Sequence, residues 1–257
     1  MMPVNKAIGN MFGNWFVEYC WSPLVGGCGH RCDIYCYAKR MYEKYSDDRK
    51  WSDKPHWASE NFKKMPDTDP VWKGFPKLPK GKIFVCHTTD LFAENIPDDW
   101  IKEILGHCNK FPESEFIYQT RNVGRIFDYL DLIPPPSWLG TTIETDDSID
   151  YQFLEISKAP DPFHRYSRMK RLRQETDFKL FITIEPIMHL TEDKEIIRWL
   201  SEIKPDLIFI GADSGKNNLP EPSRDELIEL IEELKQITHV HVKSNCKRIL
   251  GNMTLHN

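Results

Sequence analysis

Cys28-Gly29-His30-Arg31-Cys32-Asp33-Ile34-Tyr35-Cys36 contains three of the seven cysteines of this 257-residue chain and runs directly into Tyr37-Ala38. The other four cysteines, Cys20, Cys86, Cys108 and Cys246, are scattered along the sequence. An odd number of cysteines with three bunched together is typical of metal binding or redox chemistry in a cytosolic protein, rather than of disulfides. The stretch therefore predicts a metal site.

The spacing of these cysteines decides the shape that the stretch must take. On a straight helix Cys28 and Cys36 would lie ~12 Å apart along the axis, and a fully extended four-residue step spans ~13–14 Å. Both are too far for one small metal centre. The segment must therefore curl, and the glycines at 26, 27 and 29 allow this. We expect a glycine-rich loop that leads into a helix starting near Ile34.

The number of cysteines leaves two kinds of metal centre open. Three thiolates leave one iron of a 4Fe–4S cluster without a protein ligand, so that a small molecule could bind there, which points to catalysis. A structural zinc site is the alternative, with His30, Cys20 or Cys86 as the fourth ligand. In that case the chain would be a non-catalytic zinc-binding partner module.

Composition limits the class of protein. Hydrophobic residues make up 40% of the chain, which is enough for a substantial core. We find no run of ~18 apolar residues that could span a bilayer, and the N-terminus lacks the features of a signal peptide. We therefore expect a cytoplasmic protein with no membrane association. The net charge of −5 gives no global reason to expect nucleic-acid binding.

Strand and helix patterns alternate along most of the chain. We expect strands at 14–21, 82–87, 115–120, 138–143, 179–185, 206–210 and 240–243, and helices at 34–44, 98–108, 123–132, 148–158, 162–175, 192–203 and 223–236. This alternation predicts an α/β fold, a partial or near-complete parallel (β/α) barrel of about six to seven strands. It would form a single domain over 1–257, with a polar, aromatic-rich insertion at about 46–80.

Polar residues follow each expected strand. In β/α barrels, binding and catalysis collect at these carboxyl ends of the strands. Besides the cysteine stretch, the strand ends carry His87 to Asp90, Thr120 to Asn122, Glu144 to Asp146, Glu185, Asp213-Ser214 and Lys243 to Asn245. The cysteine stretch is thus expected to be the anchor of an active site.

The cysteine stretch resembles the signature of the radical S-adenosylmethionine (SAM) enzymes, C-x3-C-x2-C with an aromatic residue before the last cysteine. Tyr35 occupies the aromatic position. The second gap, from Cys32 to Cys36, is one residue longer than in that signature.

A broader resemblance covers most of the chain. The matching blocks, in order, are Trp21-Ser22-Pro23 with Gly27-Cys28, Cys36-Tyr37-Ala38, Asp90-Leu91-Phe92 with Ile96-Pro97-Asp98, Gln119-Thr120-Arg121, Trp138-Leu139-Gly140, Glu185-Pro186, and Gly211-Ala212-Asp213-Ser214-Gly215. They are similar to a phage- and mobile-element-associated family of unknown function that is radical-SAM-like and distantly similar to spore photoproduct lyase. In the last block Asp213 stands where the family more often has glutamate.

The resemblance implies a role for several residues. Cys28, Cys32 and Cys36 would hold a 4Fe–4S cluster, and SAM would be cleaved reductively to a 5′-deoxyadenosyl radical that abstracts hydrogen from a substrate. The implied SAM-binding residues are Tyr35, Thr88, Thr89, Asp90, Thr142, Glu144 and Arg168, with Arg165 as the alternative to Arg168. Glu185, Asp213 and Lys243 would face the substrate; the alternative for Glu185 is a structural carboxylate paired with Lys243.

The remaining expectations concern partners. Six positive side chains lie between His164 and Arg173, a pattern that could bind nucleic-acid phosphates or form a solvated helix face. A nucleic acid base or nucleotide is therefore one candidate substrate. Radical SAM chemistry also implies an electron donor, such as a reductase or a flavodoxin-type protein. The oligomeric state is not indicated by the sequence.

Overall fold

The computed structural model describes residues 4–7, 12, 15–32, 34–45, 52, 54–58 and 75–251. The chain divides into two compact units, Met1–Trp138 and Leu139–Asn257. Most of the expected insertion at 46–80 falls outside the described residues. The expectation of a single domain remains a prediction.

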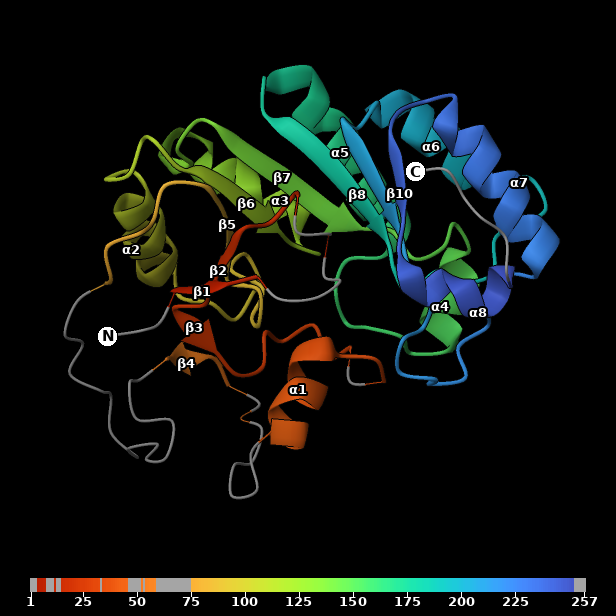
Figure 1. Cartoon of the computed structure of the whole chain (residues 1–257), viewed down its shortest axis with the longest axis horizontal. Coiled ribbons are helices and arrows are strands. Elements are labelled where there is room, and N and C mark those ends of the chain that lie inside the picture. Colours follow the sequence, from red (N-terminus) through yellow and green to blue (C-terminus); the bar gives the residue numbers. More distant parts are fainter. Residues whose placement is uncertain are drawn as a thin grey trace. The chain divides into compact units, whose positions relative to one another are not determined.

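The first unit contains short, mostly parallel strands (Figure 1). Strand β1 (Val4–Lys6) pairs antiparallel with β2 (Tyr19–Trp21), which pairs in parallel with β5 (Lys82–Val85), and β5 pairs in parallel with β6 (Glu115–Gln119). A separate two-stranded ladder joins β3 (Leu24–Val25) to β4 (His56–Trp57).

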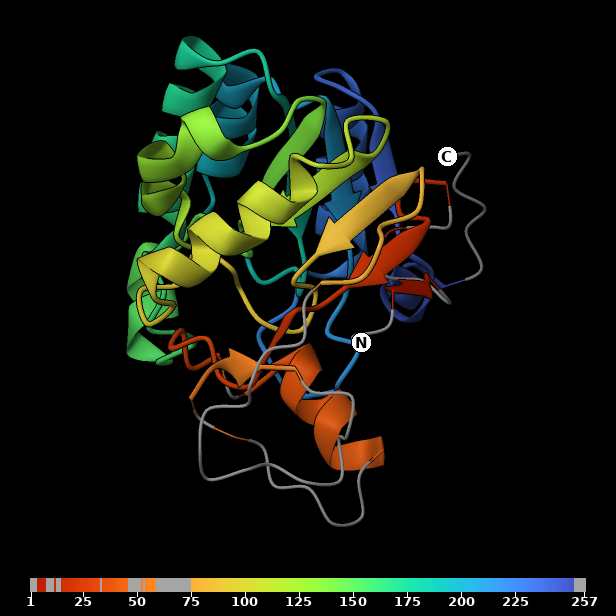
Figure 2. The same cartoon turned by 90° about the vertical axis from the view of Figure 1, so that its left-hand side faces the viewer.

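Three helices and a 3₁₀ segment complete this unit: α1 (Tyr37–Tyr45), α2 (Asp98–Cys108), α3 (Val123–Ile126) and η1 (Phe127–Leu132). Helix α2 buries Ile101, Ile104, Leu105 and Cys108, the spacing of one helix face. Helix α2 contacts η1, and both views show it on the outside of the strands of this unit (Figure 1 and Figure 2).

Strand β7 (Ser137–Thr142) begins in the first unit and ends in the second. In the second unit β8 (Lys179–Ile184), β9 (Leu207–Ile210) and β10 (Val240–Val242) pair in parallel, with Ile182 opposite Ile208 and Phe209 opposite His241. All four residues of β9 are buried. Such a continuous apolar run is typical of a parallel strand covered on both faces.

The helices of the second unit are α4 (Ser148–Phe153), α5 (Pro162–Glu175), α6 (Glu195–Ile203), α7 (Arg224–Lys235) and α8 (Lys247–Leu250), with a 3₁₀ turn η2 (Ser244–Cys246) before α8. Helix α5 begins with Pro162, and the Asp161 side chain accepts a hydrogen bond from the His164 amide. Helices α5, α6 and α7 lie outside strands β8 to β10 (Figure 1).

The expected α/β class with a mostly parallel sheet is confirmed, and eight strands belong to that sheet. Helices 98–108 and 162–175 have the predicted bounds. The prediction for the first helix was wrong at its start: α1 begins at Tyr37, after the last cysteine of the loop. Strands β1, β3 and β4 were not predicted, because two or three residues are too few to show a period.

Candidate functional site

The cysteine loop leaves strand β3 and enters helix α1, so that all three thiols lie on non-helical chain. Two glycines shape its start. Gly26 has φ +95°, and a Cβ there would lie 2.3 Å from the carbonyl oxygen of Lys54. Gly29 has φ +75° and lies against Asn95. The curl that the spacing predicted is therefore present, with glycine where the backbone requires it.

Residues that follow β5 fasten the first part of this loop. Thr88 Oγ1 donates to the Leu24 carbonyl (3.4 Å), Thr89 Oγ1 to the Gly26 carbonyl (3.0 Å), and Asn95 Nδ2 to the Gly27 carbonyl (3.1 Å). Thr88 and Thr89, two of the residues implied to bind SAM, thus have partners in the backbone of β3 and of the loop.

Asp90 joins three segments of the first unit. Its Oδ2 accepts hydrogen bonds from His30 Nε2 (2.8 Å) and from the Arg121 amide (2.8 Å), and its Oδ1 accepts from the Phe92 amide (3.0 Å). Burial raises the pKa of Asp90, but the charge and hydrogen bond of His30 and the other donors outweigh it and hold the pKa below its usual value. A buried, ionised Asp90 therefore links the cysteine loop to the end of β6.

The three thiols differ in their electrostatic surroundings. Burial, with Asp90 adding a smaller contribution, raises the pKa of Cys28 to about 12. The hydrogen bond with Cys36 and burial raise the pKa of Cys32 well above its usual value. The hydrogen bond from Cys32 and the Lys39 amide lower the pKa of Cys36 to about 7. Cys32 and Cys36 are thus in direct contact, and Cys28 is close enough to interact with both.

The three thiols match the protein ligands of a 4Fe–4S cluster with one open iron, in which each cysteine binds its own iron. A zinc ion needs ligands that converge on one point. Among the described residues, no group of three or more His, Cys, Asp or Glu is placed to hold a metal ion.

The proposed fourth ligands of a zinc site have other surroundings. His30 is bonded to Asp90. Cys20 and Cys86 are buried, and burial raises the pKa of Cys20 to about 11 and that of Cys86 well above its usual value.

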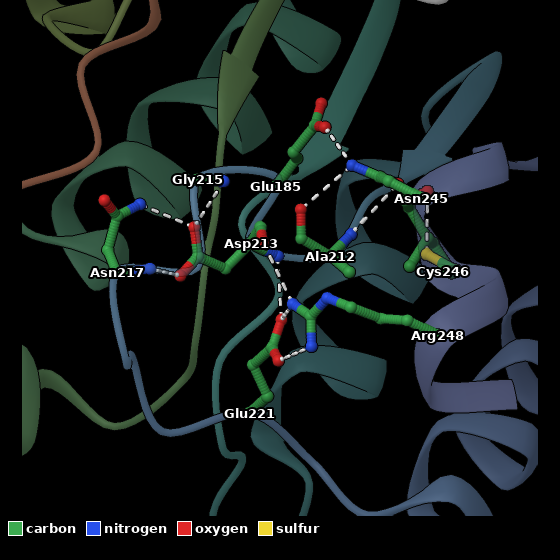
Figure 3. Close-up of polar contacts among 10 residues, drawn as sticks. Glu185, Ala212, Asp213, Gly215, Asn217, Glu221, Asn245, Cys246 and Arg248 are labelled. Atoms are coloured by element: carbon green, nitrogen blue, oxygen red, sulfur yellow. Dashed lines mark hydrogen bonds and ion pairs between the residues drawn. The ribbon is translucent and has the colours of Figure 1, made fainter. Parts of the chain in front are cut away.

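In the second unit, the ends of β8 and β10 are joined by polar contacts (Figure 3). Glu185 accepts hydrogen bonds from Lys243 Nζ and from Asn245 Nδ2 (3.0 Å). A Cβ on Gly211 would lie 2.5 Å from the Glu185 carboxyl carbon, so a larger residue there would displace the Glu185 side chain. The pairing of Glu185 with Lys243, the alternative considered from the sequence, is present; a contact with substrate stays a prediction.

Asp213 organises the loop after β9. Its carboxylate accepts hydrogen bonds from the Gly215 amide (3.1 Å), from the Asn217 amide and from Asn217 Nδ2 (2.6 Å) (Figure 3). Its own amide donates to Glu221 Oε1 (2.7 Å), and Glu221 is held by Arg248. Asp213, which stands where the family more often has glutamate, thus holds the loop that it belongs to.

Glu144 follows β7 and forms an ion pair with Arg165 of α5 at 2.8 Å, and both side chains are completely buried. Arg165 also donates to the Thr142 carbonyl, and the Thr142 hydroxyl is bonded to Thr183 (2.9 Å). Arg168, the other arginine weighed for the carboxylate of SAM, is exposed on α5.

Besides Arg165, four of the six positive side chains between His164 and Arg173 have acidic partners within the second unit. His164 pairs with Asp161, Lys170 with Glu202, Arg171 with Glu175 and Arg173 with Asp206, all within 3.0 Å. These pairs offset much of the positive charge that suggested phosphate binding.

Residues 14–240 match the sequence model of DUF5131, described as a protein of unknown function. The chain belongs to the DUF5131 family. It matches none of the curated proteins with which it was compared.

The DUF5131 chain is similar in fold to spore photoproduct lyase. With one mutant of the lyase the TM-score is 0.54 at 10% identity, covering 93% of this chain and 81% of the lyase. With another mutant that has bound AdoMet and dinucleoside spore photoproduct it is 0.52 at 11% identity, over 91% and 78%. Similarity to SuiB of Streptococcus suis bound to S-adenosylmethionine is lower, at TM-score 0.45 and 10% identity, and spans 68% of this chain and 42% of SuiB. The similarity to spore photoproduct lyase that the sequence predicted is confirmed at the level of the fold.

The DUF5131 structure groups the predicted site residues within each unit. In the first, Cys28, Cys32, Cys36, Tyr35, Thr88, Thr89 and Asp90 lie around one loop. In the second, Thr142 and Glu144 contact Arg165, whereas Glu185, Lys243 and Asp213 belong to the contacts between strand ends. Asn95 and Arg248 were not predicted, because neither directly follows a strand; Asn245 was named only among the polar residues after the last strand.

Proposed function

We propose that this DUF5131 protein is a radical SAM enzyme whose Cys28, Cys32 and Cys36 hold a 4Fe–4S cluster with one open iron. When bound, such a cluster would supply the electron that cleaves SAM to methionine and a 5′-deoxyadenosyl radical, which abstracts hydrogen from the substrate. The observation that carries this proposal is the loop itself: three interacting thiols that are not in disulfides, fixed by the buried Asp90. The lyase-like fold supports it.

The protein's own residues would position and enclose these groups. Asp90, Thr88 and Thr89 hold the loop through its backbone and His30. Tyr35 remains our candidate for contact with SAM, at its adenine. We also keep Thr142, Glu144 and Arg168 as candidates for SAM binding, although Glu144 already neutralises Arg165. Glu185, Lys243 and Asp213 remain candidates for contact with substrate.

A nucleic acid base or nucleotide is our candidate substrate class. The support is the fold shared with a lyase whose structures contain a dinucleoside spore photoproduct. At 10–11% identity this similarity supports a shared fold only. The substrate class is therefore a separate proposal. We further propose a reductase or flavodoxin-type electron donor, a cytoplasmic setting and an association with phages or mobile elements. No helix in the described part of the chain has the length and apolar character to cross a membrane.

Metal content and SAM cleavage after anaerobic reconstitution test the enzyme assignment. We expect about four iron and four sulfide per chain, a brown colour bleached by dithionite, and 5′-deoxyadenosine when SAM and reductant are added. A colourless protein with one zinc would support the alternative of a zinc-binding partner module. A loaded cluster that releases no 5′-deoxyadenosine would contradict the radical chemistry.

A pair of cysteine variants tests the ligand assignment. Cys32→Ala should lose most of its iron, because it removes one of three ligands. Cys246→Ala is the matched control: Cys246 is buried in η2 of the second unit and should leave iron content unchanged. Full iron in Cys32→Ala would rule out the assignment of this ligand.

A further inference from the structure

Arg121 lies directly after β6, and two contacts fix it against the cysteine loop. Its amide donates to Asp90 Oδ2 at 2.8 Å, which is the oxygen that also binds His30. Its side chain donates from Nη1 to the Tyr35 hydroxyl at 2.5 Å. Backbone and side chain of one arginine are thus tied to two residues of the loop that carries the cysteines.

The guanidinium group of Arg121 also packs on the aromatic ring of Tyr35. Its central carbon lies 5.1 Å from the ring centroid, a cation–π distance. Tyr35 is only 7% exposed, and its amide donates to the Cys32 carbonyl at 3.2 Å. Since Tyr35 directly precedes Cys36, the arginine charge is held beside the Cys32–Cys36 end of the loop.

Asp90 and Arg121 place charges of opposite sign beside different parts of the loop. The Asp90 carboxylate accepts from His30, between Cys28 and Cys32. The Arg121 guanidinium lies on Tyr35, the residue before Cys36. A guanidinium stays protonated at any working pH, so this positive charge is permanent.

We propose that Arg121 is a positioning residue whose fixed charge, aimed by Asp90 and Tyr35 at the Cys32 and Cys36 side of the loop, raises the reduction potential of the bound cluster. The inference rests on the proposed function, since it requires a cluster on this loop. Reduction adds a negative charge to the cluster, and a neighbouring cation stabilises that added charge. The arginine would make the cluster easier to reduce by the proposed electron donor.

The test is a redox titration of reconstituted protein, followed by the absorbance and electron paramagnetic resonance of the cluster. In Arg121→Gln, which removes the charge but keeps a donor for Tyr35, we expect the reduction equilibrium to shift at least tenfold toward the oxidised form, about 59 mV for one electron. Arg121→Lys keeps the positive charge but lacks the planar guanidinium group, and its reduction potential should lie between those of wild type and Arg121→Gln. Lys102→Gln, the same charge change on the exposed face of α2, should titrate like wild type.

Each outcome of this titration decides something different. Wild-type protein that binds no cluster would refute the proposed function, whatever the variants do. If Arg121→Gln binds its cluster and keeps the wild-type reduction potential, Arg121 does not have the proposed role. The same follows if the potential of Arg121→Lys falls as far as that of Arg121→Gln, because the lost charge would then not be the cause. If Arg121→Gln loads no iron, Arg121→Met, which also removes the charge, takes its place: a wild-type potential contradicts the proposal, and a lower one supports it.

Discussion

At the scale of single residues, the strongest constraints come from charges that the fold removes from water. Glu144 and Arg165 are both fully buried and face each other at 2.8 Å. Asp90 is ionised, mostly shielded from water and bonded to His30 of the cysteine loop, and the partly buried His87 is bonded to Ser22. Each of these groups is stable only because a partner or a change of protonation offsets the cost of its desolvation.

Breaking the Glu144–Arg165 pair should be costly for this reason. Glu144→Gln leaves the Arg165 charge buried without its counter-ion, and we expect a loss of about 3–5 kcal/mol in the free energy of unfolding, measured by urea denaturation. The double variant Glu144→Met/Arg165→Met buries no charge and should lose much less. If Glu144→Gln has the same midpoint of urea unfolding as the wild type, the ion pair does not stabilise the fold.

The pH dependence of stability should contain a contribution from His87. Burial lowers its pKa from 6.5 to about 4, so the unfolded chain takes up this proton first as pH falls. Stability is therefore lost between about pH 6.5 and pH 4, on the order of 1–2 kcal/mol by pH 5. Urea unfolding of His87→Gln at pH 7, 6 and 5 should show a shallower decline than wild type. Parallel declines would contradict the neutral, buried state of His87.

At the scale of elements, local sequence explains where several helices begin. Helix α7 starts after Ser223, whose side chain accepts from the Glu226 amide while Glu226 reaches back to the Ser223 amide. Helix α5 starts with a capping aspartate and a proline. Helix α1 shows the limit of such reasoning: Ile34 and Tyr35 have helical spacing with Ala38, yet they form a turn that presents the cysteines.

Removing the cap of α7 should destabilise the second unit measurably. Ser223→Ala leaves a helix amide without its acceptor, and we expect a loss of about 0.5–2 kcal/mol in the free energy of unfolding. Glu226→Gln is the matched control, because glutamine can complete the same capping box. The two variants should differ in thermal or urea denaturation. Equal stability of Ser223→Ala and wild type would mean that the cap contributes nothing.

At the scale of the whole molecule, charge limits how the protein could engage nucleic acid. The chain carries a net charge of −5, and the positive side chains of α5 have acidic partners. Long-range attraction to phosphates is therefore weak. Any nucleic acid substrate would have to be recognised by a local site rather than by a basic surface.

Binding to long duplex DNA should accordingly be weak and sensitive to salt. By fluorescence anisotropy we expect dissociation constants of roughly 10⁻⁴ to 10⁻⁶ M or weaker at physiological salt, the range of non-specific binding. Arg168→Glu, on the exposed face of α5, should weaken this binding further. Nanomolar affinity that persists at physiological salt would show that a dedicated phosphate-binding surface exists.

The sequence by itself determined the α/β class, most of the elements and the curled cysteine loop. Alternation of strand and helix patterns is a local property, and the cysteine spacing excludes both helix and extended chain. The fold class, and a loop able to carry three metal ligands, could therefore be predicted from the sequence alone. The bounds of α2 and α5 followed from their apolar faces and starting residues.

Only the tertiary structure decided what the polar strand ends contact. Asp90 meets His30 across 60 positions and Arg121 across 31, Glu144 meets Arg165, and Glu185 meets Lys243 and Asn245. Of these contacts, only the pairing of Glu185 with Lys243 was weighed from the sequence. Which charges neutralise each other depends on strand order and register, and these bring together residues that no local pattern connects.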